Sequence, residues 1–486
     1  MSHRFPDQLL AQITALHQEI APEASNIHAE WKIPHGHPAI SSLENLAAYL
    51  ALRRHDLSDL QPALAAHGLS TLGRSEAHVL ASLQALEASL SRIAGVAGPD
   101  YPHHATIQKG HHALQTAQSR FFGADVLGTS TRIMVTLPSE AATDQVLIHR
   151  LIKEGMTCAR INCSHDTAET WRAMADLVRA EAKAQGRECR ILMDIGGPKC
   201  RIETVHIAEH QRLQRGDRFV MVRTLAQALP TDDVIATINF PDILDQLEPG
   251  AEVWINDGKI GTRVVTAGGG RVELELHSAR SKGERLRPEK GVNFPDTELH
   301  LDPLTEKDLA DLAAVSEIAD VIGFSFVQRP NDIVRLYAEL HRRRPELTAW
   351  PLILKIETPL AVRNLPKLIV EGVLRGPLAV MIARGDLAVE LGFARLSEIQ
   401  EEIMWLCEAA QVPVVWATQV LETLVSEGMP TRAEATDAAM SQRAECVMLN
   451  KGPFLPEAVR FLADVLHRMD RHQSKKVARL GALHSW

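Results

Sequence analysis

From Thr131 onward, short apolar segments alternate with stretches of helical period. The segments are TRIMVTL, CARINCS, CRILMDI, DVIGFSF, PLILKIE, LAVMIAR, VPVVWAT and CVMLN. Each suits a parallel strand that is covered on both faces, and most gaps hold one helical segment, such as NDIVRLYAELHRRR. Eight strands that alternate with helices in this way predict an α/β protein built on a (β/α)8 TIM barrel.

Two regions depart from this alternation. Residues 202–289 carry segments of period two, such as RVELELH, separated by turns such as NDG and AGGG, and they predict a β domain inserted after the third barrel strand. Residues 1–125 show helical periodicity, as in DQLLAQITALHQEI, and predict an α-helical N-terminal domain of unassigned role. The barrel then comprises residues 126–201 and 290–472, and a C-terminal tail covers 473–486.

Composition narrows the functional classes. Charged residues make up 23% and hydrophobic residues 45% of the 486 positions, which is typical of a soluble globular protein. A net charge of -9 argues against non-specific nucleic-acid binding. No apolar run approaches the ~20 residues that span a bilayer. The six cysteines form no CxxC pair and the N-terminus lacks a signal-peptide core, so we expect a cytoplasmic location. Histidine clusters near residues 35–37 and 103–112 are expected to be exposed loop residues rather than metal ligands.

Polar residues gather at the ends of the predicted strands, where barrels of this class place their sites. The second strand ends in Arg160, Asn162 and Ser164, which share one face because side chains alternate along a strand. The third strand, in ILMDIGGPKCR, ends in Asp194 and is followed closely by two cations, Lys199 and Arg201. These charges suggest an anion or metal site, and the alternative is a solvated ion pair in an ordinary turn.

The next strand ends carry further charges. Lys355 and Glu357 end strand five on the same side, as a buried structural ion pair or as part of a catalytic site. Strand six ends in ARGDL, where Asp386 can join Glu357 as the second carboxylate of a magnesium site. Free N–H groups around Gly385, where a helix begins, could hold a carboxylate or phosphate of a substrate.

Strand seven ends in Thr418 and Gln419, and the sequence PTRAE follows. Thr431 and Glu434 stand at the spacing of a helix capping box, so a cap is preferred to a catalytic role for Thr431. Together, the strand ends agree on a pocket for an anion and magnesium.

In these segments the chain resembles the pyruvate kinase family. The motifs ARINCSH, MDIGGPKCR, INDGKI, KGVNFPD, LKIE, ARGDLAVELG, ATQVLETL and PTRAEATDAA follow the family's order between residues 130 and 470. The resemblance implies that the inserted domain is a small β-barrel that acts as a mobile lid. It also implies phosphoryl transfer between phosphoenolpyruvate and ADP, giving pyruvate and ATP, with Mg²⁺ or Mn²⁺. The partners would be these substrates, with no nucleic acid or membrane, and a homo-oligomer is compatible.

Carried over by motif, the resemblance also implies roles for single residues. Arg160 and Lys355 would stabilise the transferring phosphoryl group, Lys355 would also steady the enolate oxygen, and Thr418 would lie near the enolate carbon. Glu357 and Asp386 would hold magnesium. The substrate-binding residues would be Arg160, Lys355, Ala383, Arg384, Gly385, Asp386 and Thr418. The nucleotide side would comprise Asn162, His165, Arg201 and Lys290. The family's potassium site would be lined by Asn162, Ser164 and Asp194.

One departure from the family concerns that potassium site. Potassium-dependent members resemble Asp-Thr-Lys-Gly-Pro-Glu after strand three, and the places of the threonine and the glutamate are Ile195 and Lys199 here. The ammonium of Lys199 could supply the charge that potassium otherwise brings, so we expect K⁺ not to be required. The alternative is that Lys199 only pairs with a nearby acid.

Other departures concern the ends of the chain and the last strand. We expect the family's C-terminal domain to be absent, and the N-terminal helical region has no counterpart in the family. Asn450, Lys451 and Gly452 replace the usual Ser-Gly-Glu, which we expect to affect subunit contacts or packing.

Two other functions compete with phosphoryl transfer. One is a magnesium-dependent lyase or aldolase acting on pyruvate or oxaloacetate, and the other is a non-catalytic sensor of a phosphometabolite. The combination of Arg160, Lys355 and Arg201 favours a phosphate substrate over the first. The sensor is disfavoured because no catalytic residue is lost.

Overall fold

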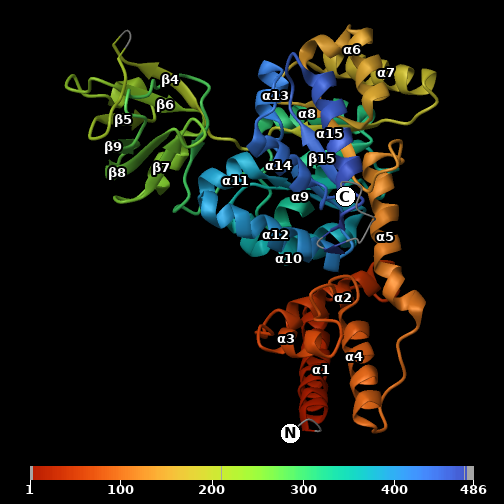
Figure 1. Ribbon diagram of the computed structural model, residues 1–486. Helices are drawn as coiled ribbons and strands as arrows, with labels where there is room; N and C mark the ends of the chain where they lie inside the picture. The colour runs from red at the N-terminus through yellow and green to blue at the C-terminus, as the bar shows by residue number, and fades with distance from the viewer. Residues whose placement is uncertain (1–3, 209–210, 476, 479–486) are drawn as a thin grey trace.

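The computed structural model describes residues 4–208, 211–475 and 477–478. A bundle of helices at the N-terminus lies below a barrel, and a β domain stands to one side of that barrel (Figure 1).

The barrel confirms the fold predicted from the sequence. Within the described residues, eight parallel strands close in the order β1-β15-β14-β13-β12-β11-β3-β2. They are β1 (Arg132–Thr136), β2 (Met156–Asn162), β3 (Arg190–Ile195), β11 (Val321–Phe324), β12 (Leu352–Ile356), β13 (Leu378–Ala383), β14 (Val414–Ala417) and β15 (Cys446–Leu449). Most of their residues are buried, as expected for strands that are covered on both faces.

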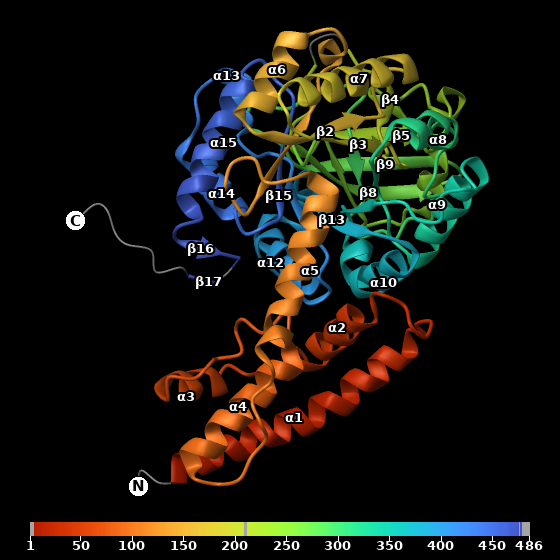
Figure 2. The same ribbon diagram turned by 90° about the vertical axis from the view of Figure 1, so that its right-hand side faces the viewer.

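Helices cover the outside of the barrel, as Figure 2 shows. They are α6 (Gln145–Glu154), α7 (Ala168–Ala184), α8 (Glu306–Ile318), α9 (Pro330–Arg343), α10 (Pro359–Arg375), α12 (Phe393–Ala409), α14 (Arg432–Ser441) and α15 (Leu455–Met469). Shorter helices follow strand ends, namely η1 (Ser139–Ala142), α11 (Arg384–Leu391) and α13 (Glu422–Glu427). The predicted capping box is confirmed, because Thr431 Oγ1 accepts from Glu434 N at 3.2 Å and Glu434 Oε2 accepts from Thr431 N at 2.8 Å.

The inserted β domain is also confirmed, and its sheet has the order β10-β7-β8-β9-β5-β6-β4. The two edges of this sheet meet at a bridge between Arg201 and Gly291, where Ile202 N donates to Lys290 O at 2.8 Å and Val292 N donates to Cys200 O at 2.9 Å. These bonds join the start of β4 to the segment at β10, in agreement with the small β-barrel that was expected. It also reaches beyond residue 289, because β10 pairs with β7. The strands are β4 (Ile202–His206), β5 (Arg218–Val222), β6 (Ile235–Ile238), β7 (Glu252–Ile255), β8 (Ile260–Gly268), β9 (Arg271–Ser278) and β10 (Val292–Asn293), with short helices η2 (Leu225–Gln227) and η3 (Pro241–Gln246).

The N-terminal region is helical, as predicted. Its helices are α1 (Arg4–Glu30), α2 (Ile40–Leu52), α3 (Leu60–Ala66), α4 (Val79–Ala94) and α5 (His104–Phe122). The last of these runs from the bundle to the barrel (Figure 2). Phe121 and Phe122, at its end, belong to one buried cluster with strand residues such as Met134, Leu192 and Val415. These phenyl rings therefore fill the end of the barrel that lies opposite the carboxyl ends of its strands.

The second histidine cluster corrects one expectation. His104, His111 and His112 are exposed, but they lie within α5 and not in a loop. Among the described residues, no group of three or more His, Cys, Asp or Glu side chains is placed to hold a metal ion.

The end of the described chain is a short antiparallel pair, β16 (Gln473–Ser474) with β17 (Val477–Ala478). The rest of the expected tail, 479–486, lies outside the described residues. None of the helices in the part of the chain that the structure describes has the length and apolarity needed to cross a lipid bilayer.

Candidate active site

The carboxyl ends of adjacent barrel strands bring the predicted charged residues together. Strands β2, β3, β11 and β12 are neighbours in the barrel, so Arg160, Asp194 and Lys355 meet although they are far apart in sequence. Asp194 is only 1% exposed, and a buried carboxylate needs charged partners to remain ionised.

Asp194 obtains these partners from two strands. Its Oδ2 accepts from Arg160 Nε at 2.9 Å and from Arg160 Nη2, and it lies 3.3 Å from Lys355 Nζ. Burial alone would raise the pKa of Asp194, but Lys355 and Arg160 hold it below its usual value. Thr136 Oγ1 accepts from Arg160 Nη1 at 3.0 Å and fixes the other side of the guanidinium. The two cations are therefore rigidly placed at the mouth of the barrel.

Lys355 is held by three oxygen atoms from three strand ends. Its Nζ donates to Ser325 Oγ at 2.7 Å and lies 3.2 Å from Glu357 Oε1, in addition to its contact with Asp194. Burial lowers the pKa of Lys355, but Asp194 and Glu357 outweigh that effect and raise it above the usual value. Lys355 thus keeps its positive charge in a site where water is largely excluded.

Glu357 and Asp386 are the carboxylates predicted as magnesium ligands. Glu357 is 2% exposed, and its Oε2 accepts from Phe326 N at 2.5 Å. Burial raises the pKa of Glu357; Lys355 opposes this shift, and Asp386 adds to it. Asp386 is therefore close enough for its charge to destabilise that of Glu357. A divalent cation between them would relieve this repulsion, so the donor set fits magnesium, which prefers a few carboxylates plus substrate oxygens.

Lys199 contacts one of these carboxylates, that of Asp386, from the chain segment that leads to the inserted domain. Its Nζ lies 2.7 Å from Asp386 Oδ1 and 5.9 Å from the centre of the Phe326 ring. Lys199 therefore does pair with a nearby acid, as the alternative interpretation of the sequence expected. It also places the ammonium next to the candidate metal ligand, at the site itself.

Thr418 and Gly385 are joined directly, because Thr418 Oγ1 accepts from Gly385 N at 2.7 Å. Thr418 has a φ of 64° and Gln419 a φ of 55°. A positive φ is a genuine outlier for a β-branched residue, and such strain collects at functional sites. The structure thus places the threonine hydroxyl, the start of α11 and Asp386 side by side.

Arg384 differs from the other predicted substrate contacts. Its guanidinium turns to α14, where it pairs with Asp437 Oδ1 at 2.5 Å, and it also donates to the carbonyl oxygens of Ala417 and Thr418. Arg384 Cζ lies 4.5 Å from the centre of the Trp416 ring. The side chain therefore fastens α11 to β14 and α14, while the backbone of Ala383 and Arg384 remains beside Asp386.

The residues expected at a monovalent-cation site are only partly free for that role. Asn162 Oδ1 accepts from Ser164 N at 3.1 Å, and Ser164 is exposed in the turn after β2. The Asp194 carboxylate, as described above, is turned to Arg160 and Lys355.

Two residues of the predicted nucleotide side, Arg201 and Lys290, are half-buried cations in the connection between barrel and β domain. Arg201 Nη1 donates to Glu289 O at 3.0 Å, which links the two chain segments that connect barrel and β domain. Burial lowers the pKa of His165, and the nearby cations Lys451 and Arg201 lower it further. His165 therefore favours its neutral form beside the cations Lys451 and Arg201. Lys290 precedes β10 in the same connection.

Sequence analysis missed Ser325, which bridges Lys355 and Asp194, and Phe326, whose amide binds Glu357. Both follow β11 in DVIGFSF, which was interpreted only as an apolar strand. The sequence offered one signal for Ser325. Its hydroxyl group follows a strand that lies between the strands of Asp194 and Lys355.

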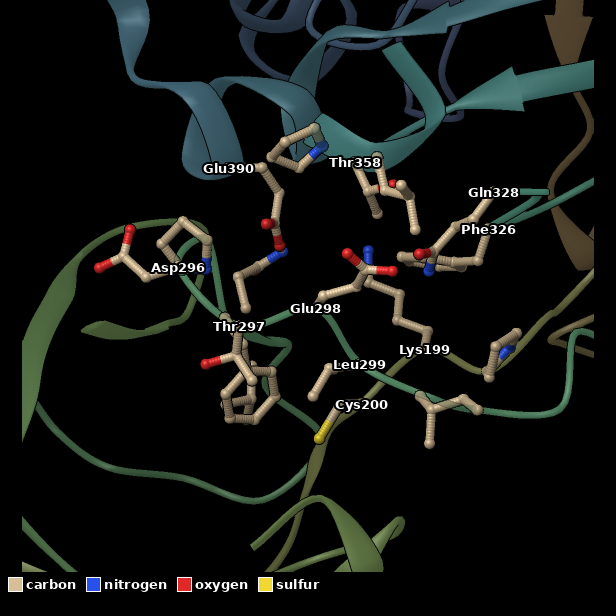
Figure 3. Close-up of a pocket in the computed structure, with 18 of the residues that line it drawn as sticks. Lys199, Cys200, Asp296, Thr297, Glu298, Leu299, Phe326, Gln328, Thr358 and Glu390 are labelled. Atoms are coloured by element: carbon tan, nitrogen blue, oxygen red, sulfur yellow. The ribbon is translucent and has the colours of Figure 1, made fainter. Parts of the chain in front are cut away.

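A cavity of about 280 Å³ lies next to this site, but neither Glu357 nor Asp386 lines it. Figure 3 shows Lys199 and Glu390 reaching into it from different elements. Its walls come from both connecting segments, the turn after β11 and the start of α10.

Comparison with known proteins identifies similar chains. A model of the pyruvate kinase barrel domain matches residues 129–454. A pyruvate kinase of Methylorubrum extorquens is 32% identical over 70% of this chain and 69% of its own length. One from Thermococcus litoralis is 30% identical over 71% of this chain and 70% of its own. One from Geobacillus stearothermophilus is 31% identical over 70% of this chain and 57% of its own.

Proposed function

The chain belongs to the pyruvate kinase family, and we propose that it transfers a phosphoryl group between phosphoenolpyruvate and ADP, giving pyruvate and ATP, with Mg²⁺ as cofactor and Mn²⁺ as a substitute. The observation that carries this proposal is the shared carboxylate of Asp194, which holds Arg160 and Lys355 together at the barrel mouth. Phosphoryl transfer depends on positioning and on neutralising charge, and two fixed cations supply both.

The proposed roles follow from these contacts. Arg160 and Lys355 bind the oxygen atoms of the transferring phosphoryl group, and Lys355 also faces the enolate oxygen that develops as the bond to phosphorus breaks. Thr418 stands where the enolate carbon gains its proton. The start of α11, with Ala383, Gly385 and Asp386, faces the carboxylate of the substrate.

Glu357 and Asp386 are the proposed magnesium ligands. When bound, the metal would neutralise charge on the phosphoryl oxygens. Lys199 now occupies one oxygen of Asp386, so its ammonium shares that carboxylate with the metal or moves aside. In either position the ammonium of Lys199 adds a positive charge to the site.

We further propose that this charge makes potassium unnecessary. The residues of the family's potassium site support this proposal, because the Asp194 carboxylate is already paired with two protein cations. Lys199 adds a further positive charge beside Asp386.

The inserted β domain is proposed to be a mobile lid over the nucleotide. Its connection to the barrel carries Arg201 and Lys290, which, with Asn162 and His165, would bind the phosphates of ADP or ATP. A cytoplasmic location is also proposed, and the six cysteines support it because all are free and buried.

A coupled assay of pyruvate formation tests the proposal. Phosphoenolpyruvate with ADP should yield pyruvate in the presence of Mg²⁺, and chelation should stop the reaction. Lys355→Met is the matched inactive variant. Pyruvate formed from oxaloacetate without ADP would instead support a lyase, and binding of phosphoenolpyruvate without turnover would support a sensor.

A further inference from the structure

The connection between the barrel and the lid consists of two segments, residues 196–201 and 290–296, here called the hinge strands. They are bonded to each other, because Val292 N donates to Cys200 O at 2.9 Å. Just beyond the first hinge strand, Ile202 N of β4 donates to Lys290 O at 2.8 Å. A bridge between Arg201 and Gly291 lies between these bonds. The two strands must therefore move together.

Helix α11 holds both hinge strands. Lys199 of the first strand pairs with Asp386, and Asn293 Nδ2 of the second donates to Glu390 Oε1 at 2.8 Å. Asp386 and Glu390 are four residues apart, so they lie on one face of the helix. The helix that carries the candidate metal ligand is thus also the support of the hinge.

The two attachments differ in exposure. The side chains of Lys199 and Asp386 are 27% and 16% exposed, and a metal ion can compete for that carboxylate. Asn293 is buried and comes from β10, which pairs with β7 of the lid. Figure 3 shows Glu390 of α11 reaching into the cavity of about 280 Å³ described above, opposite the hinge strand that bears Lys199. The contact between Asn293 and Glu390 is therefore the enclosed one.

We propose that Glu390 is a positioning residue for the nucleotide. By holding Asn293, it fixes the hinge strand that carries Lys290, and through the paired strand it fixes Arg201, relative to Asp386. This inference rests on the proposed function, because it assigns Glu390 to the ADP side of that reaction. No contact between Glu390 and either substrate is required.

Loss of the hydrogen bond between Asn293 and Glu390 would free the hinge from α11. A buried amide donor without a partner is costly, so Asn293 would turn to water and the hinge would detach from α11 if Glu390 lost its acceptor. Burial raises the pKa of Glu390 to about 7, whereas Asn293 acts in the opposite direction. A protonated carboxyl group keeps one acceptor oxygen, so the hydrogen bond with Asn293 is possible in both forms.

Two variants separate the hydrogen bond from the charge. Glu390→Ala removes the acceptor, whereas Glu390→Gln keeps an acceptor oxygen without a charge. Asn293→Ala breaks the same bond from the other side and serves if Glu390→Ala does not fold. Glu398→Ala, on the neighbouring helix α12, is the control because that side chain is half exposed and pairs with Arg395.

The first measurement is amide hydrogen exchange of residues 290–296 in the full chain, with Mg²⁺ and without substrate. Exchange should become about tenfold faster in Glu390→Ala and Asn293→Ala, as expected for the loss of one buried hydrogen bond. Glu390→Gln and Glu398→Ala should stay close to the unaltered protein. Exchange in α4, far from the hinge, should be the same in all variants, which distinguishes a hinge effect from general destabilisation.

The second measurement is steady-state kinetics. Glu390→Ala should raise KM for ADP about tenfold, the factor that corresponds to ~1.4 kcal/mol. KM for phosphoenolpyruvate should not change, because its proposed contacts come from the barrel. Glu390→Gln should restore the KM for ADP. Unchanged hinge exchange in Glu390→Ala, or an equal rise in both KM values, would overturn the proposal. If the chain had no kinase activity, the exchange result alone would decide whether Glu390 holds the hinge.

Discussion

Lys199 Nζ lies 2.7 Å from Asp386 Oδ1, although 187 positions separate the two residues in the sequence. The pair joins the segment that leads into the β domain to the helix that bears a candidate metal ligand. It places a positive charge of the protein itself beside the candidate metal ligand Asp386.

The first prediction concerns this charge and potassium. A unit charge ~6 Å from a phosphoryl oxygen, at an effective dielectric of ~20, is worth roughly 3 kcal/mol, which is enough to replace an ion kinetically. The unaltered enzyme should therefore be fully active in buffer that contains only sodium or an organic cation. Lys199→Glu should be less active and should require potassium. A tenfold or greater rise in unaltered activity on addition of potassium would contradict this account.

The second prediction concerns Lys355, whose charge is sustained by Asp194 and Glu357. Lys355→Met should lower kcat by a factor on the order of 10² to 10⁵, because a cation that acts on the transferring phosphoryl group is lost. Circular dichroism should report an intact barrel. Retention of a tenth of the activity by a folded variant would remove Lys355 from the mechanism.

The third prediction concerns stability and pH. Burial raises the pKa of Glu390 from 4.5 to about 7, so the folded chain holds a proton on this residue that the unfolded chain has released. The resulting stability is fully present below pH 4.5 and is lost as the pH rises through about 7. The free energy of unfolding of Glu390→Gln, relative to the unaltered protein, should therefore rise by about 3 kcal/mol across this range. Urea denaturation at several pH values measures the difference, and a difference that does not vary with pH would refute the assignment.

The fourth prediction concerns the N-terminal region. Phe122 is fully buried at the closed end of the barrel, so Phe122→Ala should lower the free energy of unfolding by about 3 to 5 kcal/mol through lost burial and a cavity. Phe393→Ala is the matched control, because that ring is 76% exposed and should contribute little. Equal effects of the two substitutions on denaturant unfolding would show that α5 is not part of the barrel core.

The barrel was predictable because each strand is a short apolar run and the intervening helices have a clear period. Strand alternation also predicted that Lys355 and Glu357 face the same side, and the structure places them 3.2 Å apart. The partner of Lys199 was not predictable, because it depends on how the hinge strands fold back across α11. The contact between Asn293 and Glu390, which are 97 positions apart, was missed for the same reason.

The direction of single side chains was also not predictable from the sequence. Arg384 lies in the motif ARGDL, and its sequence position suggested a substrate contact. Its guanidinium instead pairs with Asp437 of α14, since the first residue of a helix can point away from the strand ends. Ser325, in contrast, lies in the site but was not predicted to. A single hydroxyl group after an apolar strand does not alter the hydrophobic periodicity from which the strands were predicted.

The central claim is that the phosphoryl group of phosphoenolpyruvate passes to ADP, and phosphorus NMR of one reaction mixture tests it most directly. With Mg²⁺ and without potassium, the phosphoenolpyruvate signal should fall while the γ-phosphate signal of ATP rises by the same amount, and pyruvate should appear in equal quantity. Lys355→Met should leave the spectrum unchanged over the same time. Inorganic phosphate in place of ATP, or no loss of phosphoenolpyruvate with the unaltered enzyme, would contradict the account.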